Sequence, residues 1–313
     1  MVHDAEIARL FHHEPLMRQR LDELPRTSSR EAFAARDALA WKKVLMDQAV
    51  SNLDGGLQPT QSLADDSQVL ETCSCHKKVP PPIAPDPLNE FELYVMLERI
   101  GSMASDSRRD GSIWPQESLE SQNSLILWHD KYRNTALFQS QAPSLMMLWH
   151  SITMLLYMDL DILECAAGRE GHEMAEKHRQ HAYSWGASAQ AKRCIVHAIL
   201  VQRQFEQMPL GTEVPIHAPM CLYRCGIAWH CFAQFGECNR PRPEEALEFP
   251  ELESLGIDGT QLLRTEIGAH VGRSSERFLL RTVDLLRRIS HWKIADSLSS
   301  TLLSLVEESN SVF

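Results

Sequence analysis

The sequence predicts an all-α fold, an irregular array of many helices with two long loops. Three observations lead to this prediction. Apolar residues recur with the three- and four-residue spacing of amphipathic helices along most of the 313 residues, whereas the two-residue alternation of strands is nearly absent. Hydrophobic residues make up 43% of the chain, enough to bury a sizeable core. Proline, glycine and polar residues gather at 51–87 and 239–260, which are the two expected loops.

The N-terminal part predicts a helix, a flexible loop and a second helix. Ser28 with Glu31 three residues later matches a capping box, and apolar residues at helical spacing extend the following helix to about Ala49. The stretch 51–87 is polar and ends in a proline cluster, so we expect a flexible Pro-rich loop there. Pro87 suits the first position of the next helix, which a polar connection at 101–111 should end.

The centre and the C-terminal part predict further helices whose limits come from turn signals. Pro143 suits the start of one helix, Gly168 and Gly171 separate two others, and Gly186 divides the next pair. We expect these helices near 118–139, 144–166, 171–185, 188–208, 218–236, 261–290 and 291–308. The loop at 239–260 lies between them, and the whole chain, 1–313, is interpreted as one α-helical domain.

The most apolar run covers 145–158, where fourteen residues are interrupted by His150 and Ser151. A membrane-spanning helix needs about 20 apolar residues, and runs of about 10–14 are more often buried core helices. We therefore interpret this run as a core helix. Residues 1–11 carry two acidic residues and an arginine where a secretory signal needs an unbroken apolar stretch, so we expect an intracellular protein.

The charge balance argues against a protein that grips nucleic acid by itself. Asp and Glu number 42 against 31 Lys and Arg, a formal charge of −11, whereas nucleic-acid binding depends on cations that neutralise phosphates. Only the stretch 264–293 is locally basic. Its helix places Arg277, Arg281 and Arg288 near one another with Asp284 between them, and surface ion pairing, for example Arg281 with Asp284, explains this more simply than phosphate binding.

The cysteines do not match a structural zinc site. Cys73, Cys75 and His76 offer three ligands within four residues, but no second cluster lies at zinc-finger distance. Four others lack the paired two-residue spacing of such sites: Cys221, Cys225, Cys231 and Cys238. Cys221 and Cys225 would share a helix face, which suits buried thiols acting as small hydrophobic side chains. Eight cysteines in 313 residues also make no disulfide framework.

The histidines predict no metal site either. His172 and Glu173 begin like the helical motif of zinc proteases, but position 176 is Glu where that motif needs its second histidine. His178 and His181 fit a solvated helix face, because Lys177 and Arg179 lie beside them. The pair His12-His13 has no partner that the sequence identifies.

Acidic pairs and nucleophile motifs were the remaining candidates for catalysis. Asp65-Asp66 falls in the first loop, and Asp159 and Asp161 would lie about 200° apart on a helix, too far round to chelate one ion. Asp161 should instead cap a helix or face solvent. Because the sequence also has no nucleophile elbow, phosphate loop or dinucleotide fingerprint, we predict no catalytic, cofactor-binding or metal-binding residue and no enzyme.

The central block runs from Leu148-Trp149-His150 to Asp159-Leu-Asp161-Ile-Leu-Glu164-Cys-Ala-Ala-Gly168-Arg169-Glu170-Gly171. It resembles the regulatory domain of fungal transcription factors, above all of the group with two-Cys, two-His zinc fingers. Residues 5–15, the helix with Trp41, the segment 191–205 and the ending with His291 and Trp292 are similar to that family as well.

The resemblance implies an N-terminally truncated, non-catalytic regulatory domain that acts in the nucleus on transcription by RNA polymerase II. It implies that the shared residues pack helices together. Partners would be other transcription proteins or a homologous subunit, and no membrane or cofactor is implied. DNA contact and zinc would belong to a missing N-terminal zinc-finger segment.

Two alternatives remain open. A finger-less interaction protein would dimerise with relatives, and exposed leucines on the C-terminal helix would favour it, because an outward apolar stripe is typical of a partner surface. A helical lyase or synthase would use metal-bound acids, although the ligand clusters that it requires are missing from the sequence.

Overall fold

The computed structural model describes residues 40, 42–44, 89–109, 115–209, 213–236, 247–267, 271–289 and 292–311. The chain divides into two units. One unit comprises Gln19–Glu92, and the other comprises Met1–Arg18 together with Leu93–Phe313. In the first unit, residues 40 and 42–44 are helical and fall within the first predicted helix. The predicted Pro-rich loop at 51–87 lies outside the described residues.

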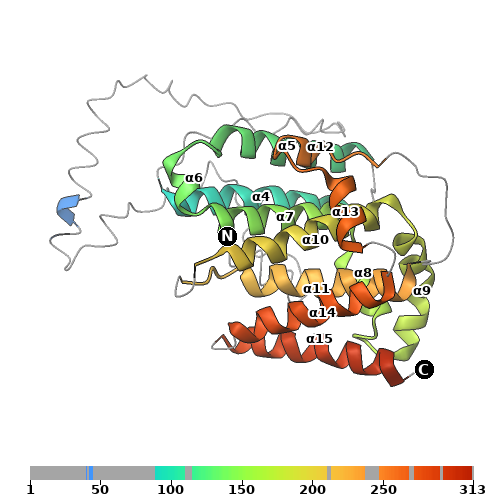
Figure 1. The fold of residues 1–313 in the computed structure, drawn as a ribbon. Coiled ribbons are helices and arrows are strands. Elements are labelled where there is room, and N and C mark those ends of the chain that lie inside the picture. Colours follow the sequence, from blue (N-terminus) through green and yellow to red (C-terminus); the bar gives the residue numbers. More distant parts are fainter. Residues whose placement is uncertain are drawn as a thin grey trace, which may run out of the picture. The chain divides into compact units, whose positions relative to one another are not determined.

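All regular elements in the described part of the chain are helices, which confirms the all-α prediction (Figure 1). They are α4 (Glu90–Arg109), α5 (Pro115–Tyr132), α6 (Ala136–Ser140), α7 (Ala142–Tyr157), α8 (Leu160–Ala166), α9 (His172–Gly186), α10 (Ala189–Gln207), α11 (Ala218–Phe235), α12 (Pro250–Glu253), α13 (Gly259–Ile267), α14 (Val271–Arg288) and α15 (Lys293–Ser311).

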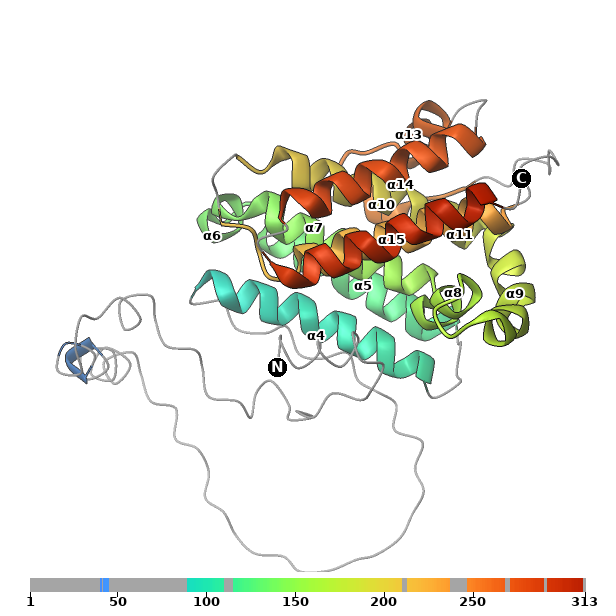
Figure 2. The same ribbon diagram turned by 90° about the horizontal axis from the view of Figure 1, so that it is seen from below.

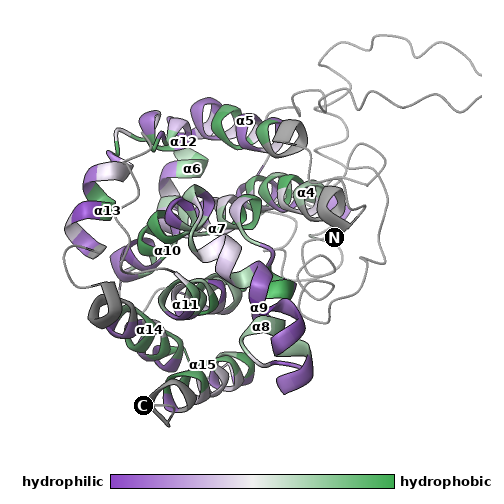
Figure 3. Ribbon diagram, turned by 90° about the vertical axis from the view of Figure 1, so that its right-hand side faces the viewer, coloured by the Kyte–Doolittle hydropathy of each residue, from purple (hydrophilic) through white to green (hydrophobic). Residues whose placement is uncertain are grey.

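Helix α11 lies at the centre of the larger unit. It contacts α7, α8, α9, α10, α14 and α15, and the view along its axis shows these helices around it (Figure 3). Nearly all of its side chains are buried, and a helix that is apolar on all sides is typical of the interior of a large helical domain. Even its Arg224 is buried, where the guanidinium donates to Ser151 Oγ on α7 at 2.9 Å.

Helix α7 is also buried along nearly its whole length. Residues 144–157 are all buried, which confirms the prediction of a core helix in the run 145–158. Its Trp149 indole donates to the Leu125 carbonyl of α5 at 2.9 Å and so joins the two helices. In the described residues no single helix has the length and hydropathy for a membrane span; α7 and α8 reach them only as a pair bent by 73°.

Some predicted helices are interrupted in the structure. The helix predicted at 144–166 divides into α7 and α8, because Met158 and Asp159 are extended and the Asp159 carboxylate caps α8 by accepting from the Ile162 N–H at 3.1 Å. The helix predicted at 118–139 divides likewise into α5 and α6, which Thr135 caps. The range 261–290 contains α13 and α14. Apolar spacing does not reveal such breaks, since the buried face continues across them.

Helix α4 extends further than the sequence predicts. The expected polar connection at 101–111 is helical through Arg109, with Gly101 and Ala104 buried. Burial of this part of the helix outweighs the low helix propensity of glycine, which is a preference of about 1 kcal/mol.

The predicted loop at 239–260 also contains helical structure. Its described residues, 247–260, include α12 and the first residues of α13. Pro250 occupies the first turn of α12, where its missing N–H costs nothing. Gly256, at φ +68°, ends it: the Ile257 N–H donates to the Leu252 carbonyl at 3.1 Å and the Gly256 N–H to the Glu253 carbonyl at 3.0 Å, the bonding of a Schellman motif.

The C-terminal helices α14 and α15 lie side by side and both contact α11 (Figure 2). Phe278 of α14 stacks on Trp229 of α11 with ring centroids 4.4 Å apart. Leu302 of α15 covers Gly226 of α11 so closely that a Cβ atom there would lie 2.4 Å from the leucine Cδ1. Leu298, Leu302 and Leu305 are buried, so the leucine stripe of α15 packs within the unit and does not support a dimer surface.

Candidate functional site

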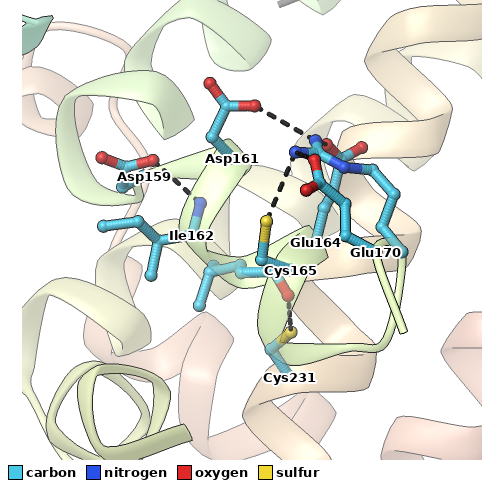
Figure 4. A network of polar contacts seen from close by, with 9 residues as sticks. Asp159, Asp161, Ile162, Glu164, Cys165, Glu170 and Cys231 are labelled. Carbon is cyan, nitrogen blue, oxygen red and sulfur yellow. Dashed lines mark hydrogen bonds and ion pairs between the residues drawn. The ribbon is translucent and has the colours of Figure 1, made fainter. Parts of the chain in front are cut away.

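The segment 159–171, which carries the central part of the family resemblance, comprises the cap of α8, α8 itself and the turn that leads to α9. Within it, the side chains of Asp161, Glu164, Cys165 and Glu170 lie close together (Figure 4), and all four contact Arg169. Its guanidinium reaches the carboxylates of Asp161 at 3.1 Å, Glu164 at 2.5 Å and Glu170 at 3.0 Å, and it donates to the Cys165 sulfur at 3.3 Å. We call this arrangement the Arg169 clasp.

Local backbone geometry explains why the clasp forms. Gly168 adopts φ +103° directly after α8, a conformation that favours glycine. The Arg169 N–H then donates to the Glu164 carbonyl at 3.0 Å and the Gly168 N–H to the Cys165 carbonyl at 3.0 Å, a second Schellman motif. This turn directs the Arg169 side chain back along α8 toward Asp161 and Glu164. Gly171, at φ +85°, then leads into α9.

The clasp stabilises a carboxylate inside the protein. The side chain of Glu164 is 5% exposed, whereas that of Arg169 is 27% exposed. Burial lowers the pKa of Arg169, but the hydrogen bond with Asp161 and the charge of Glu164 outweigh it and raise that pKa above its usual value. Burial, together with the nearby Glu164 charge, raises the pKa of Tyr223 on α11. The clasp therefore binds α8 tightly to its own turn and lies beside the central helix.

Cys165 is not an activated thiol despite its position beside Arg169. A neighbouring guanidinium favours the thiolate, yet burial raises the pKa of Cys165 more than Arg169 lowers it. The thiol therefore stays protonated at neutral pH, which does not suit a nucleophile.

A second polar arrangement connects α5, α7, α10 and α12 inside the same unit. The Nδ1 atoms of His150 and His197 lie 3.0 Å apart. His197 Nε2 lies 3.2 Å from Glu251 Oε1, and the Gln122 amide donates to Glu251 Oε2 at 2.7 Å. We call these four residues the Glu251 relay.

The hydrogen bonds of the relay fix its protons when both imidazoles are neutral. The Glu251 carboxylate can only accept, so the proton of His197 lies on Nε2 and its Nδ1 becomes an acceptor. His150 must then donate from Nδ1, which leaves its Nε2 unprotonated. Burial lowers the pKa of His150 well below its usual value, and the neighbouring His197 and His129 add to this, so a neutral His150 is the stable form.

Glu251 remains ionised in the relay. Burial raises its pKa, but the hydrogen bond with His197, a backbone hydrogen bond and the charge of Arg193 outweigh burial, so that the pKa lies below its usual value. His150, His197 and Glu251 are each at most 1% exposed. A substrate could reach them only by entering the protein interior, so the relay suits the attachment of α12 to the helices beneath it better than acid–base catalysis.

Most candidates from the sequence have structural positions. Cys221, Cys225 and Cys231 are buried in α11, and burial raises the pKa of both Cys225 and Cys231. This agrees with the prediction of thiols that act as small hydrophobic side chains. In the described residues, no group of three or more His, Cys, Asp and Glu is arranged to hold a metal ion. Cys73, Cys75, His76, Cys238, His12, His13, Asp65 and Asp66 lie outside the described residues.

The acidic pair and the α9 histidines are also accounted for. Asp159 is the cap of α8. Asp161 belongs to the Arg169 clasp, and its side chain is 48% exposed, which agrees with the expectation that it caps a helix or faces solvent. His172 and Glu173 stand at the exposed start of α9, with His181 exposed and His178 half-buried on the same helix.

The predicted ion pair of Arg281 has a different partner. Arg281 of α14 binds Glu206 of α10, with Nε 2.7 Å from Oε1, whereas the sequence pointed to Asp284 on its own helix. Arg203 of α10 pairs with Glu266 of α13 in a similar way. Contacts between helices bring these side chains together, and spacing along one helix does not report them.

Glu251 and Gln122 are the site residues that the sequence did not reveal, because 129 positions separate them. The sequence held one signal that Glu251 could be buried. The bulky apolar residues Phe249 and Leu252 lie two positions before it and one position after it, and both are buried in the structure. Comparisons of the sequence with protein-family models, with curated proteins and with solved structures found no match.

Proposed function

We propose that this chain is the helical regulatory part of a fungal transcription factor of the group with two-Cys, two-His zinc fingers. It acts in the nucleus, without catalysis, on transcription by RNA polymerase II. The observation that carries the proposal is the Arg169 clasp. Its members Asp161, Glu164, Arg169 and Glu170 all fall within the motif that resembles the family, and they bond to one another and hold the α8–α9 turn.

This use of the motif favours a packing role. If the shared acids belonged to a reactive centre, they would be directed toward a space that a substrate can enter. Glu164 is instead buried against Arg169, and Asp159 caps its own helix. The remaining shared residues, Trp149 and His150, are buried and join α7 to α5 and α10.

In this proposal DNA is bound by a zinc-finger segment outside this chain, and zinc belongs to that segment alone. The helical array contacts other transcription proteins or a homologous subunit, and it needs no cofactor and no membrane. The acidic balance of the chain fits partners other than nucleic acid.

The two alternative functions have less support. A dimerising, finger-less module would expose the leucines of α15, but Leu298, Leu302 and Leu305 are buried. A metal-dependent lyase would need grouped acids, and Asp159 and Asp161 serve the cap and the clasp instead.

Tagging the chain at its own locus tests the proposal. We expect the tagged protein in the nucleus and enriched at promoters in chromatin immunoprecipitation. Arg169→Leu should abolish the enrichment, whereas Arg179→Leu, which removes an exposed ion pair with Glu176 on α9, should leave it unchanged. Exclusion from the nucleus, or promoter signal no higher than in an untagged strain, would refute the proposal. Reading the genomic sequence upstream of the Met1 codon for zinc-finger codons tests where DNA contact originates.

A further inference from the structure

Residues 247–258 have an unusual composition for a connection between helices. They contain four acidic residues and five bulky apolar ones, interleaved, with no Lys or Arg. Alternation of acidic and bulky apolar residues is typical of amphipathic transcriptional activation segments, in which charges keep the chain solvated while apolar side chains contact a partner. We call residues 247–258 the acidic segment.

The fold buries the apolar side chains that such a segment would present to a partner. Phe249 and Leu252 are buried, whereas Glu248 and Glu253 are exposed. The Phe249 ring lies against Gly259 at the start of α13, where a Cβ atom would lie 2.6 Å from the ring. Phe249 and Leu252 are thus inaccessible to a partner, while Glu248 and Glu253 are exposed to solvent.

Glu251 fastens this segment to the helices below. Both of its oxygens have a donor from another element, Gln122 of α5 and His197 of α10. A carboxylate taken out of water is costly to hold unless it is hydrogen-bonded, so these two donors decide whether the segment stays in place. Beyond Glu251, the Arg133 guanidinium holds the Ser254 carbonyl at 3.0 Å at the protein surface.

We propose that residues 247–258 are an acidic activation segment that the regulatory array masks, with Glu251 as the residue that holds it in place. When released, it binds a transcription protein whose apolar groove is flanked by Lys or Arg. This inference rests on the proposed function and adds to it the segment that activates and the contact that silences it. In this proposal the hydrogen bonds of the Glu251 relay, which no substrate can reach from the surface, hold the acidic segment in place until it is released.

The test uses the full chain fused to a heterologous DNA-binding domain in yeast, with a reporter gene. Gln122→Leu removes one donor from Glu251 and leaves the acidic segment itself intact. It should raise reporter expression several-fold over the wild-type chain. Gln190→Leu, at an exposed position on α10, is the matched control and should leave the reporter unchanged. Adding Phe249→Ala and Leu252→Ala to Gln122→Leu should return the reporter to the wild-type level, because the released segment then lacks its apolar contacts.

Hydrogen exchange on the same purified proteins reports release directly. Gln122→Leu should lower protection of the amides at 247–258 roughly tenfold while α11 stays protected, since loss of one buried hydrogen bond shifts a local equilibrium by about that factor. Glu251→Gln, which removes the charge but keeps the shape, is a second variant that should open the segment.

The outcomes separate the two proposals. Loss of protection at 247–258 without a rise in reporter expression overturns the activation segment, while the proposed function still depends on nuclear location and promoter enrichment. Unchanged protection in both variants overturns Glu251 as the fastening. A reporter rise that survives Phe249→Ala with Leu252→Ala also overturns the inference, because the activity would then come from another part of the chain.

Discussion

The contact between Gly226 and Leu302 allows a sharp test of how α15 packs on the central helix. Leu302→Ala removes a fully buried leucine, which should lower the free energy of unfolding by about 3 kcal/mol through lost burial and a remaining cavity. Gly226→Ala places a methyl group 2.4 Å from Leu302 Cδ1 and 2.6 Å from Cδ2. Such overpacking costs about 1–3 kcal/mol, and the better helix propensity of alanine offsets about 1 kcal/mol of it.

The two substitutions should therefore not be additive. With Leu302→Ala already present, the clash disappears and the Gly226→Ala methyl partly fills the cavity, so that only the gain in helix propensity remains. We expect Gly226→Ala to destabilise the otherwise native chain by about 1 kcal/mol, after subtracting the propensity gain. In the Leu302→Ala background it should stabilise the chain by about 1 kcal/mol.

Urea unfolding of the four proteins, followed by circular dichroism, measures this cycle. The expected coupling between the two positions is about 2 kcal/mol, within the range seen for residues in contact. Equal effects of Gly226→Ala in both backgrounds would refute the packing of Leu302 on Gly226. Thr301, exposed on the outer face of α15, supplies a control. Thr301→Ala should raise the free energy of unfolding by less than about 0.7 kcal/mol, through helix propensity alone, and should not change the effect of Gly226→Ala.

Three further predictions concern the clasp, a buried histidine and the thiols. Arg169→Leu should lower the free energy of unfolding by about 2 kcal/mol, less than for a fully buried pair because the Arg169 side chain is 27% exposed. The control Arg179→Leu should change the free energy of unfolding by less than about 0.5 kcal/mol. Equal urea midpoints for the Arg169→Leu protein and the wild-type protein would contradict the stabilising role of the clasp. Burial lowers the pKa of His230 to about 4, so the unfolded chain gains a proton below about pH 6.5 that the folded chain does not, and stability should fall from pH 6.5 to pH 4 by on the order of 3 kcal/mol. In His230→Gln the stability-versus-pH curve should be flatter over that interval, and an unchanged slope would exclude His230 as its source. Iodoacetamide at pH 8 should leave Cys165, Cys194, Cys221, Cys225 and Cys231 unlabelled in the native protein and label them in urea, because all are buried; labelling of Cys225 with helicity intact, read by mass spectrometry, would contradict its burial.

Features with a local cause were predictable from the sequence. Apolar spacing alone predicts the core helix at 145–158. The four-residue spacing of Cys221 and Cys225 likewise predicts that both lie on one buried helix face. The boundaries of α9 and the start of α10 follow from Gly168, Gly171 and Gly186, and the structure places these helices within one residue of the predicted ranges 171–185 and 188–208.

Features that depend on tertiary contacts were not predictable in the same way. The helix break at Asp159 was not predicted, because Met158 and Leu163 on either side of it are both buried and continue the helical spacing of apolar residues. Gly101 suggested the end of a helix, yet its burial keeps α4 continuous. Arg281 had an acidic neighbour on its own helix, and only the packing of α14 on α10 shows why Glu206 is the partner.

The two polar sites differ in how far apart their members lie in the sequence, and this difference bears on function. The Arg169 clasp joins residues at most eight positions apart, so α8 and its turn bring the members together almost unaided. The Glu251 relay joins residues 54 and 129 positions apart, and therefore exists only while α5, α10 and α12 are all in place. A local site of the first kind suits a permanent structural joint. A site of the second kind depends on the relative positions of several helices. Any partner that shifts α5 relative to α10 would therefore weaken the hydrogen bonds of Gln122 and His197 with Glu251, and would loosen the acidic segment without contacting it.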